Sequence, residues 1–342
     1  MTLRLSSALL VSSALALASC TVNISDPAET EAMVFSAVAS HSTRGIIATT
    51  NYPVNEPFMV EAVHSGKPFM SGEKVQYDST LGIWKTEEDF MWPLNGTIVF
   101  YAASPILTQI SISHEKGVEA DWSITTDAEA ETDLCFAQAE EPCKSHTAVV
   151  PIVFSHALSQ ICFKARSQRH YSSSQTAGNL IQANVITIIL DSVKIGGIIS
   201  EGHFTQNPYS WETDSSKTAD YTIYSDKEGQ ILRVDRYDNP ILSHLKTMLL
   251  IPQTLPKSAY IEEWHHGTVR TSITDKSTGN IVKDTTYVIP KHERIPLAKY
   301  CEKWVPEYKF TFRIAVGLEE NTVISTAVTD WTETKEIILG DE

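Results

Sequence analysis

The stretch MVFSAVA, residues 33–39, indicates the fold class because its side chains alternate in character with a period of two. In an extended strand, successive side chains point to opposite faces of the sheet. One face of this strand carries Met33, Phe35, Ala37 and Ala39. Because that face holds Phe35 and Met33, we expect it to turn toward a core.

Short segments of the same kind recur along the chain, rich in β-branched or aromatic residues and bounded by Pro, Gly, Asn or Ser. In the first half they are residues 57–63, 73–78, 97–103 and 132–138. The second half contains segments of the same kind, for example NVITIILDSVKIGGII (184–199) and YKFTFRIAV (308–316). Many short strands at regular spacing predict an all-β protein, and the length suggests two β-sandwich domains.

The apolar patterning lapses at residues 104–131 and 139–146, and we place a domain division there. This predicts an N-terminal domain over 33–144 and a C-terminal domain over 145–342. Residues 20–32 are polar and contain a proline, which is typical of a short spacer ahead of a fold.

The N-terminus predicts export. A single positive charge, Arg4, precedes an apolar stretch over 8–18, which is about half of the roughly 20 residues that span a bilayer. The sequence LASC at 17–20 resembles a bacterial lipobox, in which cleavage leaves a cysteine that carries diacylglycerol. We therefore expect residues 1–19 to be a signal peptide and Cys20 to be lipidated. The alternative is an ordinary signal peptide with an incidental cysteine.

The composition is that of a folded, acidic protein. Hydrophobic residues make up 42% of the 342 residues, charged residues make up 20%, and the net charge is −15. A surface of that charge repels nucleic acid, so nucleic acid is not an expected partner.

Four cysteines remain beside Cys20. Cys135 and Cys143 are the closest pair in sequence, and in an exported chain they could form a disulfide. Cys162 and Cys301 lie in apolar segments, where we expect buried free thiols.

The chain lacks the familiar signatures of catalysis: no G-x-S-x-G, H-E-x-x-H, C-x-x-C or phosphate-binding glycine loop occurs. Cys135, Cys143 and His146 are possible metal ligands, but no fourth partner stands at finger-like spacing. His265 and His266 are adjacent, so on a strand they would point to opposite faces. We therefore expect no catalytic residues, no metal and no cofactor.

Several segments, taken in order, resemble the fimbrillin family of Bacteroidetes, the Mfa-like lipoproteins of type V pili. They are MVFSAVASHSTRG (33–45), DFMWPLNGTIVFYAASP (89–105), PIVFSHALSQICFKA (151–165), MLLIPQTL (248–255), KWVPEYKFTFRIAV (303–316) and AVTDW (327–331). Two positions depart from the family pattern: Met91 replaces the usual Tyr before Trp92-Pro93, and Trp304 lacks the following Pro-Gly turn.

The resemblance implies two tandem transthyretin-like (Greek-key) β-sandwich domains and assembly by strand exchange between subunits. In that scheme an arginine-specific protease cuts after the first strand, which then leaves its groove. Here the displaced strand would be residues 33–39, with Met33, Phe35, Ala37 and Ala39 facing the groove. The cut would fall between Arg44 and Gly45. The alternative is that Arg44 is an ordinary loop residue and the intact chain is an anchor or accessory subunit.

A C-terminal strand of the next subunit would fill the groove. Ile337 and Leu339 lie two residues apart, so they would enter adjacent pockets, and 322–328 is a second candidate donor. Alternatively, the last segment completes its own C-terminal sheet.

These expectations describe a non-enzymatic fimbrial subunit or fimbrium-anchoring lipoprotein at the outer membrane that supports adhesion. Its partners would be other fimbrial subunits, the outer membrane through its lipid, the protease, and host or bacterial surface ligands. One alternative is a surface glycan-binding lipoprotein, which a row of exposed tryptophans would favour. Another is a glycosidase, which requires a cleft with two carboxylates about 5–10 Å apart.

Overall fold

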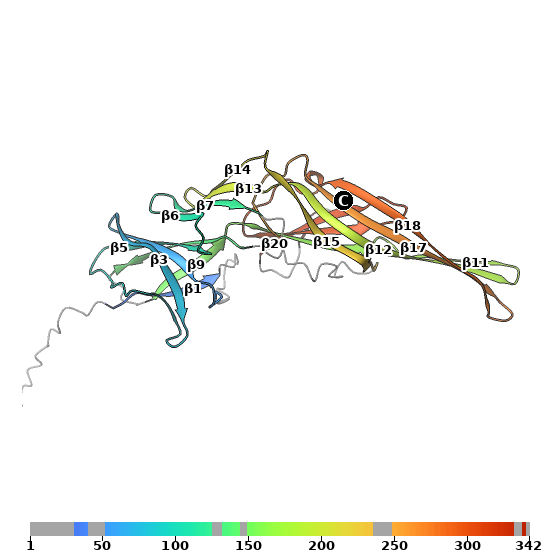
Figure 1. The fold of residues 1–342 in the computed structure, drawn as a ribbon, viewed down its shortest axis with the longest axis horizontal. Helices are drawn as coiled ribbons and strands as arrows, with labels where there is room; N and C mark the ends of the chain where they lie inside the picture. Colours follow the sequence, from blue (N-terminus) through green and yellow to red (C-terminus); the bar gives the residue numbers. More distant parts are fainter. Residues whose placement is uncertain are drawn as a thin grey trace, which may run out of the picture.

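A computed structural model describes residues 31–39, 52–124, 132–143, 149–234 and 248–331, together with the backbone of 337–339. Cys20, Arg44 and Gly45 lie outside these residues, so their proposed roles stay predictions. The chain is all-β, as the sequence predicts, and its sheets follow one another along an elongated molecule (Figure 1).

The first sheet is a closed barrel with the strand order β1-β4-β3-β2-β5-β8-β9. Its strands are β1 (Val34–Ala39), β2 (Phe58–His64), β3 (Lys67–Asp78), β4 (Ile83–Thr86), β5 (Thr97–Ser104), β8 (Cys135–Pro142) and β9 (Val149–His156). Ser65 and Gly66 both have positive φ angles, 51° and 74°, and join β2 to β3 in a tight two-residue turn. The hydrogen-bonded strands thus form a closed ring, whereas the sequence predicts a β-sandwich of two separate sheets.

The barrel encloses a core rich in aromatic side chains. Phe58 and Phe100 are fully buried, and Phe154 is 1% exposed. Alternation produces this core, because every second residue of β2, β5 and β9 points inward.

A small sheet with the order β14-β13-β7-β6 adjoins the barrel. It consists of β6 (Ile110–Ser113), β7 (Gly117–Ser123), β13 (Glu201–Thr205) and β14 (Ser210–Thr213). Since β7 pairs with β13, this sheet joins segments about 80 residues apart in sequence. Two strands from beyond residue 144 pair with strands of the first half: β9 lies in the barrel, and β13 pairs with β7. The domain division near residue 144 remains a prediction.

Two further sheets follow. One has the order β16-β10-β19-β20-β21, formed by β16 (Met248–Leu250), β10 (Ser159–Ser167), β19 (Tyr308–Val316), β20 (Val323–Asp330) and β21 (Ile337–Leu339). The other has the order β11-β12-β17-β18, formed by β11 (Tyr171–Ala177), β12 (Leu180–Ile199), β17 (Tyr260–Asp275) and β18 (Ile281–Pro296), with β15 (Thr218–Ile231) paired to β12. Together they bury a second core that includes Leu190, Ile261 and Phe312.

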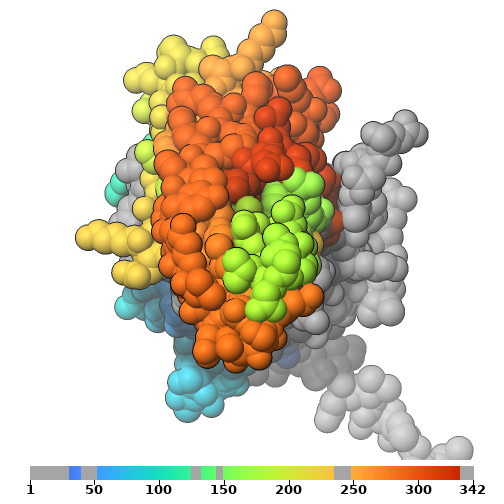
Figure 2. Space-filling view, turned by 90° about the vertical axis from the view of Figure 1, so that its right-hand side faces the viewer, coloured from blue at the N-terminus to red at the C-terminus, as the bar shows by residue number. Residues whose placement is uncertain are grey.

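Three strands are longer than the sequence suggests: β12 has 20 residues against the 16 of segment 184–199, and β17 and β18 have 16 each. Their outer halves and β11 project beyond the core as a distal arm, residues 171–186 and 269–287 (Figure 1). Figure 2 shows this end of the molecule, with the β11–β12 and β17–β18 segments in front. A short 3-10 turn, Leu297–Lys299, follows β18. Within the described ranges, we find no helix of the length and hydropathy that a membrane span requires.

Candidate assembly site

Strand β1 completes the barrel, and its two edges are bonded unequally. On one side it runs parallel to β9 through six paired residues, from Val34↔Val149 to Ala39↔Phe154. On the other side its register with β4 consists of the single pair Phe35↔Trp84. Most of the backbone bonding that holds β1 in place therefore comes from β9.

The inward face of β1 is the one that the sequence indicates. Met33 and Phe35 are 2% exposed and Ala37 is 7% exposed, whereas Ala39 is half-buried. The Phe35 ring meets Phe58 and Phe100 edge-on, at centroid distances of 6.4 and 6.0 Å. Such contacts add about 0.5–1.5 kcal/mol per pair beyond the area they bury.

The residues that flank β1 are also bonded to the barrel. The Met33 amide donates to the Phe90 carbonyl at 2.7 Å, and the Trp92 amide donates to the Glu31 carbonyl at 3.1 Å. The Tyr52 amide donates to the Ala37 carbonyl at 3.3 Å. An empty β1 position would therefore expose an apolar slot together with the unpaired backbone edge of β9, which are the requirements for strand addition.

The candidate donor residues Ile337 and Leu339 lie in β21. This strand is antiparallel to β20, with the pairs Val328↔Ile337 and Thr326↔Leu339. The second candidate, 322–328, falls largely within β20, which is bonded on both sides by β19 and β21. In this structure the chain's last strand thus adds to its own C-terminal sheet, which was the alternative arrangement.

The suggested disulfide between Cys135 and Cys143 is not formed, and both thiols are free and buried. The reason is geometric: Cys135 begins β8 and Cys143 follows its last residue. Eight residues of extended strand span about 26 Å, whereas a disulfide needs Cα atoms within about 7 Å. Burial raises the pKa of both thiols.

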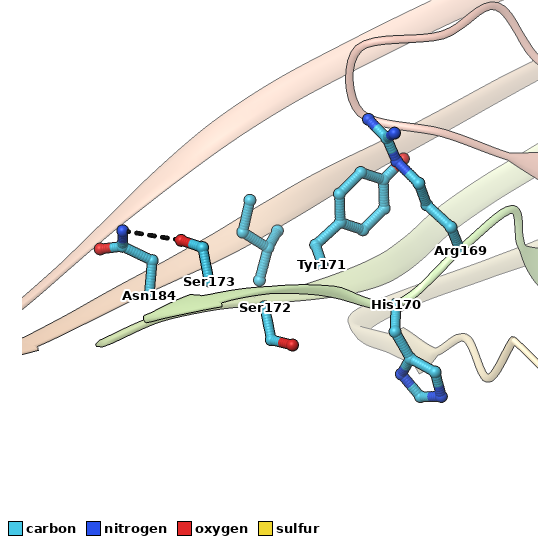
Figure 3. Close-up of a pocket in the computed structure, with 7 residues that line it drawn as sticks. Arg169, His170, Tyr171, Ser172, Ser173 and Asn184 are labelled. Carbon is cyan, nitrogen blue, oxygen red and sulfur yellow. Dashed lines mark hydrogen bonds between the residues drawn. The ribbon is translucent and has the colours of Figure 1, made fainter. Parts of the chain in front are cut away.

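A shallow hollow of about 250 Å³ lies at the base of the distal arm and contains polar residues that the sequence did not single out. Figure 3 shows Arg169, Tyr171 and Asn184 on one side of the chain and His170 on the other. Arg169 is neutralised by Glu319 and Glu320, at 2.9 and 2.7 Å. The Tyr171 hydroxyl donates to Glu320, and the Asn184 amide donates to Ser173. These polar groups already satisfy one another, so they make a weak ligand site.

The seven tryptophans do not form an exposed platform. Trp84, Trp92, Trp122 and Trp304 are buried, and Trp211, Trp264 and Trp331 are half-buried. A second hollow, of about 470 Å³, is lined by Trp122 and by four carboxylates: Asp121, Glu201, Glu212 and Asp214. Hydrogen bonds from Ser216 lower the pKa of Asp214, which is opposite to what a general acid requires.

His265 and His266 point to opposite faces of β17, as their adjacency predicts. His265 is buried: its Nδ1 lies 2.7 Å from Glu263 Oε2 and its Nε2 lies 3.1 Å from the Gly317 carbonyl. His266 bonds to Asp191 on the other face. These contacts are structural links between strands and loops.

A family model described as fimbrillin-like matches residues 43–331. A comparison with curated proteins gave no match.

Among solved structures, the chain is similar to a candidate cell adhesion protein from Bacteroides uniformis, with 15% identity and a TM-score of 0.50 over 88% of this chain and 98% of that one. It is also similar to a candidate cell adhesion protein from Bacteroides ovatus, with 12% identity and a TM-score of 0.49 over 90% of this chain and 100% of that one. The first likeness bears on the fold alone.

The family match, residues 43–331, begins after β1 and ends before β21, so it covers the other barrel strands, the small sheet, the arm and the remaining strands of the two C-terminal sheets. The resemblance read from the ordered segments is therefore confirmed, and the chain belongs to the fimbrillin-like family.

Proposed function

We propose that this protein is a fimbrial subunit or a fimbrium-anchoring lipoprotein that assembles by protease-triggered strand exchange and supports adhesion at the cell surface. The family supports a structural, non-enzymatic role. Other fimbrial subunits would be its main partners, and a lipid on Cys20 would hold it at the outer membrane. The two solved structures described above carry cell-adhesion names, which agree with this proposal.

The observation that carries the proposal is the construction of the β1 slot. Strand β1 is a single short ribbon whose removal leaves the other six barrel strands in a continuous sheet. Its inward side chains, Met33 and Phe35, leave pockets that another alternating apolar strand can fill. Burial of each such large side chain contributes roughly 1.5–3 kcal/mol, and ordering the incoming strand costs about 1–2 kcal/mol per residue.

We further infer that the barrel and the C-terminal sheets are variants of two tandem transthyretin-like sandwich domains. Two separate apolar clusters support this: one includes Phe35, Phe58 and Phe100, and the other includes Leu190, Ile261 and Phe312. In the first unit, the pairing of β1 with β4 and β9 closes the two layers into a barrel.

An arginine-specific protease tests the mechanism directly. We expect the purified precursor to be cut after Arg44 and then to form higher oligomers that survive electrophoresis without boiling. The Arg44→Lys variant is the matched control, because it keeps the charge and removes the cleavage specificity. Resistance of the wild type at Arg44 would refute protease triggering. Cleavage that leaves a lasting monomer would refute polymerisation and leave the anchoring role.

The donor strand is tested in the same assay. The double variant Ile337→Asp/Leu339→Asp places charges where we propose that apolar pockets are filled, so the cut protein should stay monomeric. Val288→Asp is the control, because Val288 is 57% exposed in β18 and lies outside both candidate donor segments. Unchanged oligomers from the double variant would rule out β21 as the donor.

The two alternatives receive less support. A glycan-binding lipoprotein was expected to expose a row of tryptophans, and all seven are buried or half-buried. A glycosidase needs a carboxylic acid with a raised pKa beside a second carboxylate, and in the acidic hollow the shift at Asp214 is downward.

A further inference from the structure

Three side chains of different chemistry meet at one end of the barrel. Cys135 and His156 are directly opposite each other in the antiparallel β8–β9 pair. Directly opposite residues of a sheet share a face, with Cβ atoms about 4.5–5.5 Å apart. Asp133 precedes Cys135 by two residues, and its carboxylate contacts both the Cys135 thiol and the His156 ring. Sheet register therefore gathers a thiol, an imidazole and a carboxylate.

The donor atoms converge on one point. His156 Nδ1 lies 2.5 Å from Asp133 Oδ2, Cys135 Sγ lies 3.3 Å from the same oxygen, and Sγ lies 3.7 Å from Nδ1. All three ligand atoms lie within 4.8 Å of one another. Donor atoms in a tetrahedral zinc site are roughly 3.2–3.7 Å apart, given Zn–N and Zn–O bonds of about 2.0–2.2 Å and Zn–S bonds of about 2.3 Å. Two of the three separations already fall in or near this range, and the third must lengthen by roughly 0.8 Å.

A second observation points to a missing partner. The other oxygen of the carboxylate, Asp133 Oδ1, is buried and has no hydrogen-bond partner among the described residues. A buried carboxylate oxygen without a partner is costly. The His156 ring is fixed in orientation, because it stacks on Trp331 with a centroid distance of 4.1 Å and an interplanar angle of 4°. The His156 and Asp133 side chains are 12% and 27% exposed, so a small ion can reach them.

The same three residue types could make a cysteine nucleophile with its base, but the geometry disfavours that. In such a triad the thiol and the carboxylate bond to different nitrogens of the imidazole. Here both face Nδ1. Burial, followed by the nearby charge of Asp133, raises the pKa of the Cys135 thiol, whereas a nucleophile requires a lowered one.

We propose that Asp133, Cys135 and His156 form a zinc site at the junction between the barrel and the end of β20. The mixed sulfur, nitrogen and oxygen donors are those that Zn²⁺ accepts, and three protein ligands leave a fourth position for water or another ligand. When Zn²⁺ binds, the S–H bond of Cys135 breaks, the proton passes to solvent and the sulfur forms the Zn–S bond. The proton that joins His156 Nδ1 to Asp133 Oδ2 is displaced to His156 Nε2 or to solvent, and the Nδ1 lone pair forms the Zn–N bond. Affinity therefore rises with pH.

Such a site would strengthen the end of the barrel where β1 finishes, because Ala39, the last residue of β1, pairs with Phe154, two residues before His156. The metal would join the start of β8 to the end of β9, and β9 is the strand that holds β1. Through the His156–Trp331 stack it would also connect the barrel with the C-terminal sheet. This inference concerns the folded subunit and stands whether or not the chain polymerises.

The test is a titration of the full, reduced protein with Co²⁺ and then Zn²⁺. We expect one equivalent of Co²⁺ to give tetrahedral d–d bands with a thiolate-to-cobalt charge-transfer band, and Zn²⁺ to displace it. Cys135→Ser should abolish the charge-transfer band. His156→Gln and Asp133→Asn should weaken Zn²⁺ binding at least about 10-fold, the lower end of the loss seen when even an outer-shell partner is removed.

Two matched controls separate this site from adventitious binding. Cys143→Ser removes the other buried thiol, which directly follows β8, and His266→Gln removes a half-buried His–Asp pair elsewhere; neither should change the titration. Thermal unfolding of each variant without metal establishes that it is folded, and Zn²⁺ should raise the Tm of the wild type but not of Cys135→Ser. A stoichiometric Co²⁺ complex without a thiolate band, or equal Zn²⁺ affinity in wild type and Cys135→Ser, would overturn the proposal.

Discussion

The barrel and the distal arm are built from strands with the same alternating pattern, yet different forces hold them. In the barrel, one face of each strand reaches a shared aromatic core, as Phe35 does. In the arm, large apolar side chains such as Tyr287 remain 51% exposed. Backbone ladders and cross-strand polar pairs hold the arm instead, for example the two-pronged Arg270–Asp284 contact with distances of 3.1 and 2.6 Å.

This difference shows that an alternating pattern predicts a strand but does not predict whether a core covers its apolar face. A barrel strand gains from burial, which amounts to about 25 cal/mol per Å² of apolar surface. An arm strand gains mainly from pairing, at about 0.2–1 kcal/mol per cross-strand pair. Substitutions should therefore have large effects in the barrel and small ones in the arm.

The largest expected effect is that of Phe35→Ala in the barrel. Truncation removes the edge-on contacts with Phe58 and Phe100 and leaves a cavity, so the unfolding free energy should fall by about 3–5 kcal/mol. Tyr287→Ala in the arm is the matched control and should change it by no more than about 0.5 kcal/mol. Urea denaturation followed by tryptophan fluorescence measures both. Equal losses would contradict the contrast between the two regions.

His265 tests whether burial also stabilises the base of the arm, because this side chain lies there and is buried. His265→Leu removes a hydrogen-bond partner of the buried Glu263 carboxyl group and should cost about 1–3 kcal/mol. We expect the low end of the usual range because the Thr322 hydroxyl still donates to Glu263 at 2.7 Å.

The neighbouring variant His266→Leu serves as the control in the same thermal or urea unfolding measurement. Its partner Asp191 is partly solvated, so the loss should stay below about 1 kcal/mol. Reversal of this order would mean that the buried cluster does not stabilise the base of the arm.

Within the arm, Asn184 provides a smaller test. Its side-chain amide donates to Ser173 at 3.1 Å, and its carbonyl accepts from Thr271 at 2.8 Å, which links three strands in one row. Asn184→Ala should cost about 1 kcal/mol, the net contribution of a typical hydrogen bond. Amide hydrogen exchange in β11 and β12 measures this local loss. The control variant at an exposed neighbour, Gln182→Ala, should leave the exchange rates unchanged. Equally faster exchange in both variants would mean that the hydrogen bonds of Asn184 do not stabilise the arm.

The smallest expected effect is a pH dependence in the small sheet beside the barrel. A hydrogen bond with Asp121 raises the pKa of His203 above its usual value near 6.5. The stabilisation is therefore fully present below about pH 6.5 and is lost as pH rises through the folded-state pKa. Since His203 is 37% exposed, solvent screening keeps the effect below about 1 kcal/mol.

Thermal unfolding at about pH 6 and about pH 8 should show this loss in the wild type. His203→Gln should remove that part of the pH dependence. The same slope in both proteins would mean that another group is responsible.

The relation between sequence and site is clearest at the cysteines. The sequence pairs Cys135 with Cys143 by proximity and offers His146 as a third ligand. His146 lies outside the described residues, and among those the structure places Asp133 and His156 beside Cys135. Spacing in sequence could not show this, because the extended β8 separates Cys135 from Cys143 and the β8–β9 pairing selects His156. A histidine at the end of one strand opposite a cysteine at the start of the previous one is the signal that could have found it.

The sequence alone determined that the chain is all-β, that Met33 and Phe35 share the inward face of β1, and that His265 and His266 diverge. These properties follow from side-chain alternation, which is local to each strand. Only the tertiary structure decided that β1 pairs with β9, that β12, β17 and β18 extend into an arm, and that β21 lies on its own sheet. Partner and register depend on contacts between distant segments, and one strand's pattern is compatible with many of them.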